Sequence, residues 1–269
     1  MNKILLVGCG HMGSALLKSW LSETNSSFTV IDPVQFKKIN KIFNKRAIAV
    51  KSILEVKNIS EFNLIIFAIK PQMAEEVLKK FTDCKFNKNC TFVSIVAGKK
   101  INFFHQYLPT TNDFIRVMPN MPALINHGMS CLVAKKNISI KNKNKINKLF
   151  SILGKTLWLK NEKDIDKVTA ISGSGPGYIF LIIDAFEKAA LQLGLGKKTT
   201  KKLVHQTLLG STHLLFNESL TAQKLANKIA IKGGTTEAGL NQFKKNKILH
   251  NVFKKVVEAA YKRANQLGK

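Results

Sequence analysis

The chain has 269 residues, 45% of them hydrophobic, and a formal net charge of +27, which leaves room for two globular domains. The longest apolar stretch near its middle, Tyr178–Ile183, is shorter than the about 20 residues that cross a bilayer, so we expect a soluble protein with no membrane partner. Only three of the 43 basic residues are Arg, and the Lys residues are scattered along the chain. Because specific phosphate and base recognition favours Arg, the charge argues against a specific nucleic-acid partner.

The first residues predict a strand, a turn and a helix rather than an export leader. The apolar run Ile4–Val7 ends after four residues, whereas a leader has roughly 7–15. The glycine motif G-x-G-x-x-G follows over Gly8–Gly13. Its first glycine allows a tight turn, its second lets a pyrophosphate approach the backbone, and its third lets the helix pack on the strand. The predicted helix Ser14–Leu21 directs its N-terminal amides toward the phosphates.

An acidic residue follows the second predicted strand, Phe28–Ile31. This residue, Asp32, lies nineteen positions after Gly13, about where a carboxylate accepts a hydrogen bond from the adenosine ribose 2′-OH. The order of elements therefore predicts binding of NADPH or NADH. The carboxylate favours NADH because it repels the 2′-phosphate of NADPH, and NADPH stays open because Lys37 and Lys38 are near enough in sequence to offset the repulsion.

The rest of the chain divides into two halves of different character. Short apolar runs alternate with amphipathic stretches up to about residue 161, which predicts an α/β, Rossmann-like domain with a doubly wound sheet over residues 1–161. Helical periodicity alone continues over residues 162–269 and predicts an all-helical domain. Its helices carry apolar faces, for example the one with Ala185, Ala189 and Leu193. A single layer of helices cannot bury this much apolar surface, so we expect a homodimer or higher homo-oligomer. Strands are predicted at 3–7, 28–31, 47–50, 64–69, 91–96, 114–118, 129–134 and 156–159, and later helices at 73–81, 138–153, 164–171, 177–193, 199–216, 221–230, 235–244 and 248–267.

Ligands of a doubly wound sheet lie beyond the carboxyl ends of its strands. Lys70 and Pro71 end the fourth strand, Ala97 follows the fifth, and Asn120 stands between two prolines after the sixth. We therefore expect the cofactor to contact residues of these strand ends and of the glycine loop. The predicted set is Val7, Gly8, Cys9, Gly10, His11, Met12, Gly13, Asp32, Ala68, Ile69, Lys70, Pro71, Ala97 and Asn120.

Two glycine clusters interrupt the helical half. In Ile171–Tyr178, Pro176 fits the first position of a helix with Ser174 near its cap. In Lys232–Leu240, glycines precede two threonines at a helix start. Free amides, the positive end of a helix dipole and two hydroxyls together suit an anion such as a carboxylate.

The four cysteines show no C-x-x-C spacing, and no metal-ligand spacing occurs among them and the six His. We expect reduced thiols in a cytoplasmic protein and no metal site.

At this point the sequence resembles the pyrroline-5-carboxylate reductases. The matching segments are VGCGHMGSAL, AIKPQ, RVMPNMPAL, VTAISGSGPGYIF and GGTTEAGL, in the order and spacing of that family. The resemblance implies NAD(P)H-dependent reduction of Δ1-pyrroline-5-carboxylate to L-proline, the last step of proline biosynthesis. It also implies dimers that interlock through helices, with each site near the dimer interface.

The resemblance further implies roles for particular residues. Thr236, the expected catalytic residue, bonds the substrate ring nitrogen, while amides around Gly234 and Thr235 hold the carboxylate. Glu162 matches a family acid near the substrate, which orients the loop or favours the iminium.

Three positions depart from the family pattern. Ile231-Lys232 stands in place of Ser-Pro, Lys228 in place of Asn, and Gly177 in place of Ala. The lost Ser hydroxyl weakens carboxylate anchoring, and our hypothesis is that a Lys, Lys232 first, replaces it as a point charge. We therefore count Lys228 and Lys232 among the substrate-binding residues.

Two other functions stay open. One is another NAD(P)-dependent imine reductase or a hydroxyacid dehydrogenase on the same scaffold, against which the GGTT loop argues. The other is a non-catalytic binding module for polyanions. Turnover of the imine acid, of a hydroxyacid or of neither separates the three.

Overall fold

The computed structural model describes residues 3–43, 46–135 and 138–268. The chain forms two compact units. The first comprises Met1–Ser174 together with Ala260–Lys269, and the second comprises Gly175–Ala259. The predicted domain boundary falls after residue 161, whereas the compact units divide after Ser174, because Ile165 and Asp166 are buried in the first unit.

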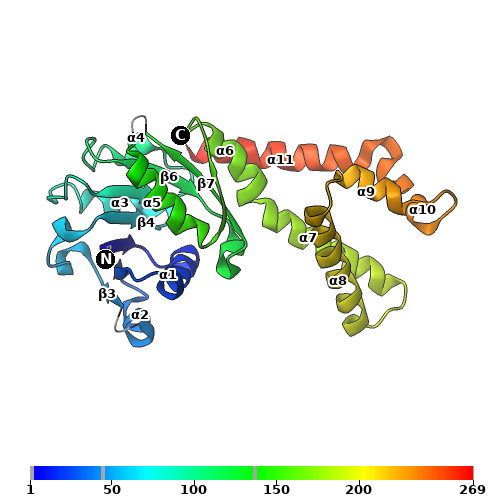
Figure 1. The fold of residues 1–269 in the computed structure, drawn as a ribbon, viewed down its shortest axis with the longest axis horizontal. Helices are drawn as coiled ribbons and strands as arrows, with labels where there is room; N and C mark the ends of the chain where they lie inside the picture. The colour runs from blue at the N-terminus through cyan, green and yellow to red at the C-terminus, as the bar shows by residue number, and fades with distance from the viewer. Residues whose placement is uncertain (1–2, 44–45, 136–137, 269) are drawn as a thin grey trace. The chain divides into compact units, whose positions relative to one another are not determined.

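The first unit is built on one eight-stranded sheet (Figure 1) in the order β3-β2-β1-β4-β5-β6-β7-β8. β1 to β6 run parallel, β7 pairs antiparallel with β6, and β8 runs parallel to β7. The predicted strands are confirmed, although β4 and β5 end two residues earlier than predicted, where the chain turns into the loops that follow them. The strands are β1 (Lys3–Val7), β2 (Ser27–Ile31), β3 (Ala47–Val50), β4 (Leu64–Phe67), β5 (Thr91–Ser94), β6 (Phe114–Met118), β7 (Gly128–Ala134) and β8 (Gly154–Trp158).

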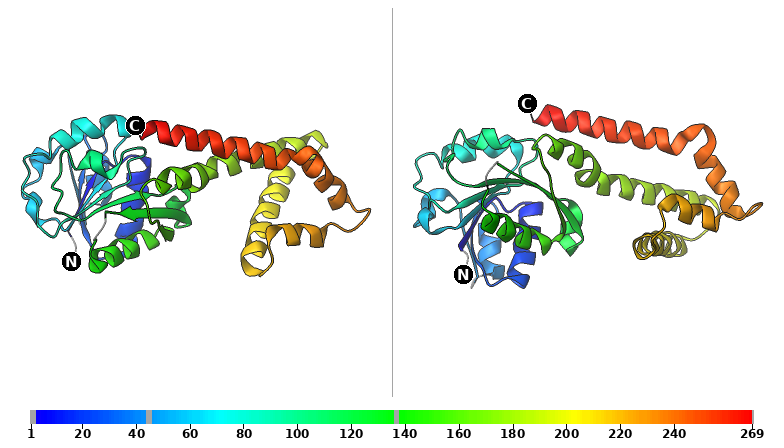
Figure 2. Two further views of the ribbon diagram at one scale, coloured as in Figure 1. Left: turned by 90° about the horizontal axis from the view of Figure 1, so that it is seen from above. Right: turned by 45° about the horizontal axis from the view of Figure 1, so that its top comes forward.

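Helices cover both faces of this sheet, as the views in Figures 1 and 2 show. Alternate side chains of β1 enter two separate cores: Ile4 and Leu6 pack with Trp20, and Leu5 packs with Phe104. This division is the doubly wound arrangement expected from the continuous apolar strands. The helices of the unit are α1 (His11–Glu23), α2 (Phe36–Phe43), α3 (Ala74–Lys79), α4 (Ile101–Phe104), α5 (Ile140–Ser151) and α6 (Asp164–Val168).

α7 (Gly175–Gln192) begins within the first glycine cluster of the helical half, close to the predicted start, but the expected cap at Ser174 was wrong. A π-turn over Thr169–Gly173 joins α6 to α7, and Ser174 has helical dihedral angles rather than those of a cap. The N–H of Ser174 donates to the carbonyl of Thr169 at 2.8 Å, the five-residue spacing of a π-turn. The turn carries the helix past Pro176, which has no N–H of its own.

The second unit consists of helices, as predicted. α7 and α8 pack together, and α7 has no buried residue in the part of the chain that the structure describes. Its apolar side chains include Leu181, which is 69% exposed. One helical stretch, Asp164–Gln192, is long and apolar enough to meet the length and composition of a membrane span. The remaining helices are α8 (Lys197–Asn217), α9 (Ala222–Ile229), α10 (Thr235–Lys244) and α11 (Ile248–Leu267), of which the last part of α11, from Ala260, belongs to the first unit.

Candidate dinucleotide site and substrate loop

Two of the three glycines in the loop between β1 and α1 leave no room for a side chain. Gly8 has φ +92°, and a Cβ added there would lie 2.7 Å from the carbonyl oxygen of Ala68. A Cβ at Gly13 would lie 2.5 Å from the carbonyl oxygen of Gly8, whereas one at Gly10 would meet no atom within 4 Å. The first and third glycines therefore hold strand, turn and helix together, and the second leaves open space, as the motif predicts.

A cavity of about 760 Å³ opens at this loop. Its walls include the ends of β1, β2, β3 and β4 and the start of α1, all in the first unit. Of the predicted cofactor residues, those lining it are Val7, Gly8, Cys9, Gly10, His11, Asp32, Ala68, Ile69 and Lys70. Met12, Gly13, Pro71, Ala97 and Asn120 are not among its lining residues.

The electrostatics of the cavity suit an anion. Lys18, Lys38, Lys51, Lys70 and Lys80 line it, and the only acids among its lining residues are Asp32 and Glu76. Glu76 pairs with Lys80 at 3.1 Å. The first turn of α1 holds no acidic residue, and no side chain caps it, so its amides are left for a phosphate.

Asp32 is buried and its carboxylate is held by the backbone. Its Oδ2 accepts from the amide of Cys9 at 2.7 Å, while Oδ1 accepts from the amides of Val34 at 2.9 Å and Gln35 at 2.8 Å. The carboxylate thus ties the end of β2 to the glycine loop, a structural role that the sequence did not reveal. It also fixes a negative charge in the cavity wall.

The cysteines are unpaired, and burial keeps the thiol nearest the cavity protonated. All four cysteines are free. Burial, helped by the charge of Asp32, raises the pKa of Cys9 to about 12, so the thiol in the glycine loop is neutral near pH 7.

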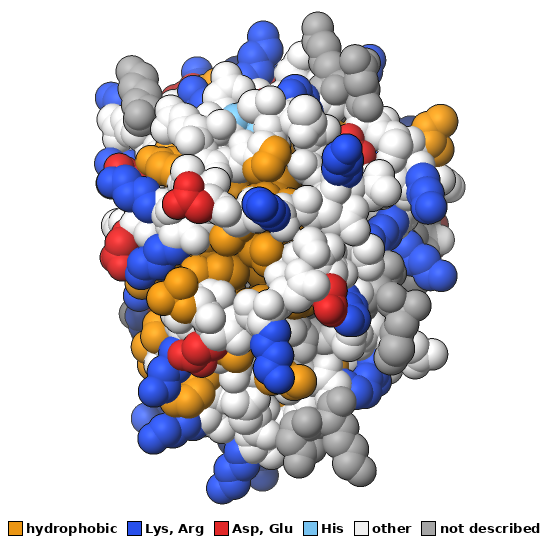
Figure 3. Space-filling view, turned by 90° about the vertical axis from the view of Figure 1, so that its left-hand side faces the viewer, with side chains coloured by type: hydrophobic (Ala, Val, Ile, Leu, Met, Phe, Trp, Pro, Cys, Tyr) orange, Lys and Arg blue, Asp and Glu red, His pale blue; other side chains and the backbone are white. Residues whose placement is uncertain are grey.

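On the face of the first unit that Figure 3 draws, the Lys and Arg side chains are scattered rather than gathered into one patch. Figure 3 shows one face on which they surround hydrophobic side chains near the middle, with a few acidic side chains among them. This distribution resembles a solvated surface more than the continuous basic stripe of a nucleic-acid interface.

The loop after β5, where Ala97 lies, is covered by the end of α11. Gly98 has φ +74°, and a Cβ added there would lie 2.5 Å from the carbonyl oxygen of Leu267. Residues far apart in the sequence thus share one edge of the first unit. Nothing local in either segment could have predicted this contact.

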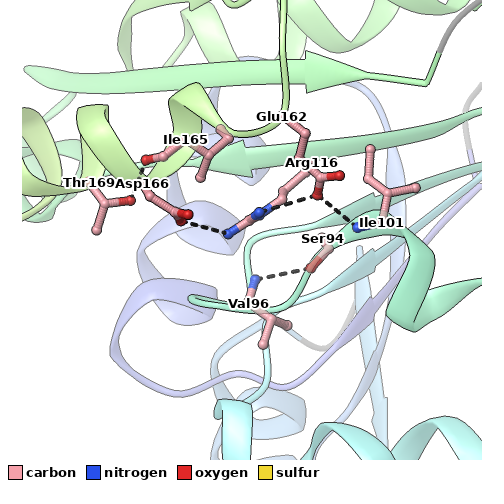
Figure 4. Close-up of polar contacts among 8 residues, drawn as sticks. All are labelled: Ser94, Val96, Ile101, Arg116, Glu162, Ile165, Asp166 and Thr169. Carbon is pink, nitrogen blue, oxygen red and sulfur yellow. Dashed lines mark hydrogen bonds and ion pairs between the residues drawn. The ribbon is translucent and has the colours of Figure 1, made fainter. Parts of the chain in front are cut away.

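A buried ion cluster joins β6 to α6 beside that loop (Figure 4). The guanidinium of Arg116 lies 3.2 Å from Oε1 of Glu162 and 3.8 Å from Oδ1 of Asp166. Glu162 Oε1 also accepts from the amide of Ile101 at 2.8 Å, at the first residue of α4. Glu162, predicted to lie near the substrate, is here engaged within the first unit, and its role toward substrate stays a prediction.

The second glycine cluster forms a turn that ends at the start of α10. Gly233 has φ +76° and donates to Glu237 Oε2 at 2.8 Å, while Gly234 donates to the carbonyl of Ile231 at 2.9 Å. The Gly234 amide is therefore used inside the turn and is not the free donor that we expected. Thr235 and Thr236 occupy the first two helical positions, where amides lack helical partners.

The comparisons with known proteins bear on both sites. A family model described as pyrroline-5-carboxylate reductase dimerisation matches residues 162–267, and one described as NADP oxidoreductase coenzyme F420-dependent matches residues 3–98. The pyrroline-5-carboxylate reductase of Pasteurella multocida is 30% identical over 100% of this chain and 98% of that protein. The chain belongs to the pyrroline-5-carboxylate reductase family. This is a family of NAD(P)-dependent oxidoreductases, as the predicted fold and motifs indicate.

Solved structures agree with this assignment to the pyrroline-5-carboxylate reductases. The enzyme of Plasmodium falciparum with NADP bound has a TM-score of 0.86 and 28% identity and covers 100% of this chain and 98% of its own. The enzyme of Coxiella burnetii has a TM-score of 0.87 and 26% identity, with 100% and 99% covered. A reductive aminase of Aspergillus terreus, at 15% identity and a TM-score of 0.58, shares the fold.

Sequence reasoning missed part of the cavity wall. Lys51 and Ser52 follow β3, and Lys80 lies just after α3. The strand Ala47–Val50 was predicted, so the rule that ligands lie beyond strand ends could have pointed to the two residues after it.

Proposed function

We propose that this chain reduces Δ1-pyrroline-5-carboxylate to L-proline with a reduced nicotinamide dinucleotide. The observation that carries the proposal is the joint presence of a glycine-loop cavity and a GGTT turn in a chain similar over its whole length to these reductases. The cofactor supplies a hydride from nicotinamide C4 to the imine carbon, C2 of the substrate ring, which becomes C5 of proline. The protonated imine nitrogen keeps its proton and becomes the secondary amine, so one hydride and one proton are consumed per turnover.

The residues of this chain would bind and orient the reactants. The open space at Gly10 and the uncapped amides of α1 fit a pyrophosphate. The amides of Thr235 and Thr236 would hold the substrate carboxylate, and the Thr236 hydroxyl would meet the ring nitrogen. Such alignment is the main contribution a protein makes to hydride transfer.

The test is oxidation of NADH and NADPH with and without Δ1-pyrroline-5-carboxylate, with proline identified as the product. A hydroxyacid serves as the competing substrate in the reverse direction with oxidised cofactor. Turnover of the hydroxyacid alone would favour the dehydrogenase alternative, and turnover of neither would favour the binding module.

Replacing Thr236 tests the catalytic assignment. We expect Thr236→Val to lower kcat/KM for the imine by about a hundredfold, the lower end of what a positioned proton-bearing group contributes. The melting temperature should hold, because the helix cap is Gly234 and no side-chain capping bond is present. Thr236→Ser keeps the hydroxyl and should retain most of the activity; equal losses in both variants would contradict the assignment.

Lys232 is exposed and lies just before the glycine turn. We expect Lys232→Ala to raise KM for the imine acid about fivefold, as loss of roughly 1 kcal/mol of solvent-exposed attraction gives, with little change in kcat. Lys244→Ala, at the other end of α10, is the matched control. An unchanged KM for the imine acid in Lys232→Ala refutes the compensation hypothesis.

The fixed charge of Asp32 supports a preference for NADH over NADPH, measured as kcat/KM. Asp32→Asn keeps an oxygen for the amides of Val34 and Gln35 but removes the charge, so the ratio should move toward NADPH by about tenfold, or 1.4 kcal/mol. Damage to the loop should lower kcat/KM for NADH and for NADPH alike, so the ratio of the two values is the quantity to measure. A wild-type preference for NADPH would contradict the proposal.

The proposal includes homodimerisation through the second unit. Its many exposed apolar side chains, among them Leu193 at 83% and Phe216 at 80%, support pairing with a second copy, because extensive exposed apolar surface marks an interaction site. The same pairing would account for the apolar stretch Asp164–Gln192 without a membrane. A cytoplasmic location stays a prediction.

A further inference from the structure

The side chain of Asn120 bridges two parts of the first unit. It is 9% exposed at the residue after Pro119. Its Oδ1 accepts from the amide of Met129 at 2.8 Å, and its Nδ2 donates to the carbonyl of Ser172 at 2.9 Å. Both ends of the amide are thus engaged within the protein, and contact with the cofactor stays a prediction for this residue.

The carbonyl of Ser172 is one that the helix cannot satisfy in the usual way. Its α-helical donor would be the N–H four residues later, and that residue is Pro176. The bond from Asn120 to this carbonyl is partly buried, and a fully buried carbonyl without a donor costs about 1–3 kcal/mol, an upper bound for this one. The Asn120 amide gives it the missing hydrogen bond.

The bridge also fixes where the π-turn lies. A Cβ added at Gly173 would be 2.9 Å from Cε of Met118, the last residue of β6, so the turn is seated directly against this strand end. The carbonyl of Asn120 accepts from the amide of Ala123 at 3.1 Å and so starts the next loop. π-turns inside helices occur frequently at functional sites, and strand ends of this sheet type carry the ligands.

We propose that Asn120 is a positioning residue of the reductase, supplying to Ser172 the donor that Pro176 lacks and so holding the π-turn against the carboxyl end of β6. Two residues of the segment Ser172–Pro176 thus have a structural explanation. Pro176 removes one hydrogen-bond donor, and Gly173 lets the turn pack closely against Met118. The functional part of the inference rests on the proposed function, because its readout is turnover of the imine.

The test is a double-variant cycle. Asn120→Asp keeps an oxygen that accepts from the amide of Met129, but it replaces the donor to the Ser172 carbonyl with a second acceptor. We expect kcat/KM to fall about tenfold at temperatures where the protein is folded. Pro176→Ala restores an N–H to that carbonyl and should by itself change kcat/KM less than about threefold. In the combined variant, Pro176→Ala should recover most of the activity lost in Asn120→Asp.

The matched control is Asn112→Asp. Asn112 is 5% exposed and donates to the carbonyls of Asn87, Lys88 and Cys90. This change removes a comparable buried donor elsewhere and should lower the melting temperature without changing kcat/KM. Pro176→Ala should not rescue it.

Two results would overturn the inference: a folded Asn120→Asp protein with wild-type kcat/KM, or a combined variant as impaired as Asn120→Asp alone. If Asn120→Asp does not fold, recovery of a folded, active protein by Pro176→Ala supports the inference, and failure of the combined variant to fold overturns it. Absence of turnover in the wild type would instead refute the proposed function, and the melting temperatures of the four proteins would still decide whether the two positions are coupled.

Discussion

Replacing Gly13 with alanine should strongly weaken cofactor binding and lower the stability of the first unit. The added Cβ would lie 2.5 Å from the Gly8 carbonyl oxygen, so α1 must move away from the loop that it supports. Overpacking of this kind costs roughly 1–3 kcal/mol of stability. Displacing the amides at the start of α1 should raise the Kd for the dinucleotide by about a hundredfold, or 2.7 kcal/mol. Titration calorimetry with NADH and NADPH and thermal unfolding measure the two effects.

The control for Gly13 is the neighbouring glycine with open space. A Cβ at Gly10 meets no protein atom within 4 Å, and its φ is −67°, so Gly10→Ala should leave the melting temperature unchanged. It should still impair cofactor binding, because the methyl group occupies the space proposed for the pyrophosphate. Equal melting temperatures for Gly13→Ala and the wild type would show that the packing argument is wrong.

The sheet and the glycine loop were predictable because their causes are local. Continuous apolar runs such as Leu64–Phe67 can only be buried on both faces, and a G-x-G-x-x-G after such a run has few alternatives. The helices of the second unit were predictable for the same reason, since their periodicity extends over many turns. The errors fell at Ser174 and Pro176, where a π-turn replaces a cap. Helical propensity says nothing of a wide turn whose donor comes from Asn120, fifty-two positions earlier.

The sequence predicted many of the residues of the candidate site, but it did not predict the hydrogen bonds among them. Asp32 was recognised by its position after β2, yet its three backbone bonds depend on how the loops meet in space. Gly234 was expected as an anion donor, but its amide closes the turn onto Ile231. Each case is a competition for one donor or acceptor, which only the folded backbone decides.

Replacing Arg116 with methionine should cause the largest loss of stability. The Arg116 side chain is 4% exposed, and its partners Glu162 and Asp166 have side chains that are 28% and 8% exposed. Removing the cation leaves two carboxylates together with little solvent, and breaking a buried ion pair from one side costs about 3–5 kcal/mol. We expect a fall of about 3 kcal/mol in the free energy of unfolding, because Glu162 keeps some solvent and the Asp166 contact is long. Urea unfolding of the variant and the wild type measures it.

The companion variants show whether charge or packing is responsible. If the uncompensated carboxylates cause the loss, Asp166→Asn in the Arg116→Met background should recover about half of it, since one buried charge then disappears. Arg46→Met is the matched control, because Arg46 donates to the carbonyls of Leu21 and Thr24 rather than to carboxylates, and it should cost only about 1 kcal/mol. If both arginine variants lose a similar amount of unfolding free energy and Asp166→Asn recovers none of it, the methylene groups of Arg116 stabilise the fold by packing and its charge does not contribute. Recovery would instead show that the cluster is an electrostatic brace, which keeps α4 and α6 fixed beside the loop at Ala97 through Glu162 and its bond to Ile101.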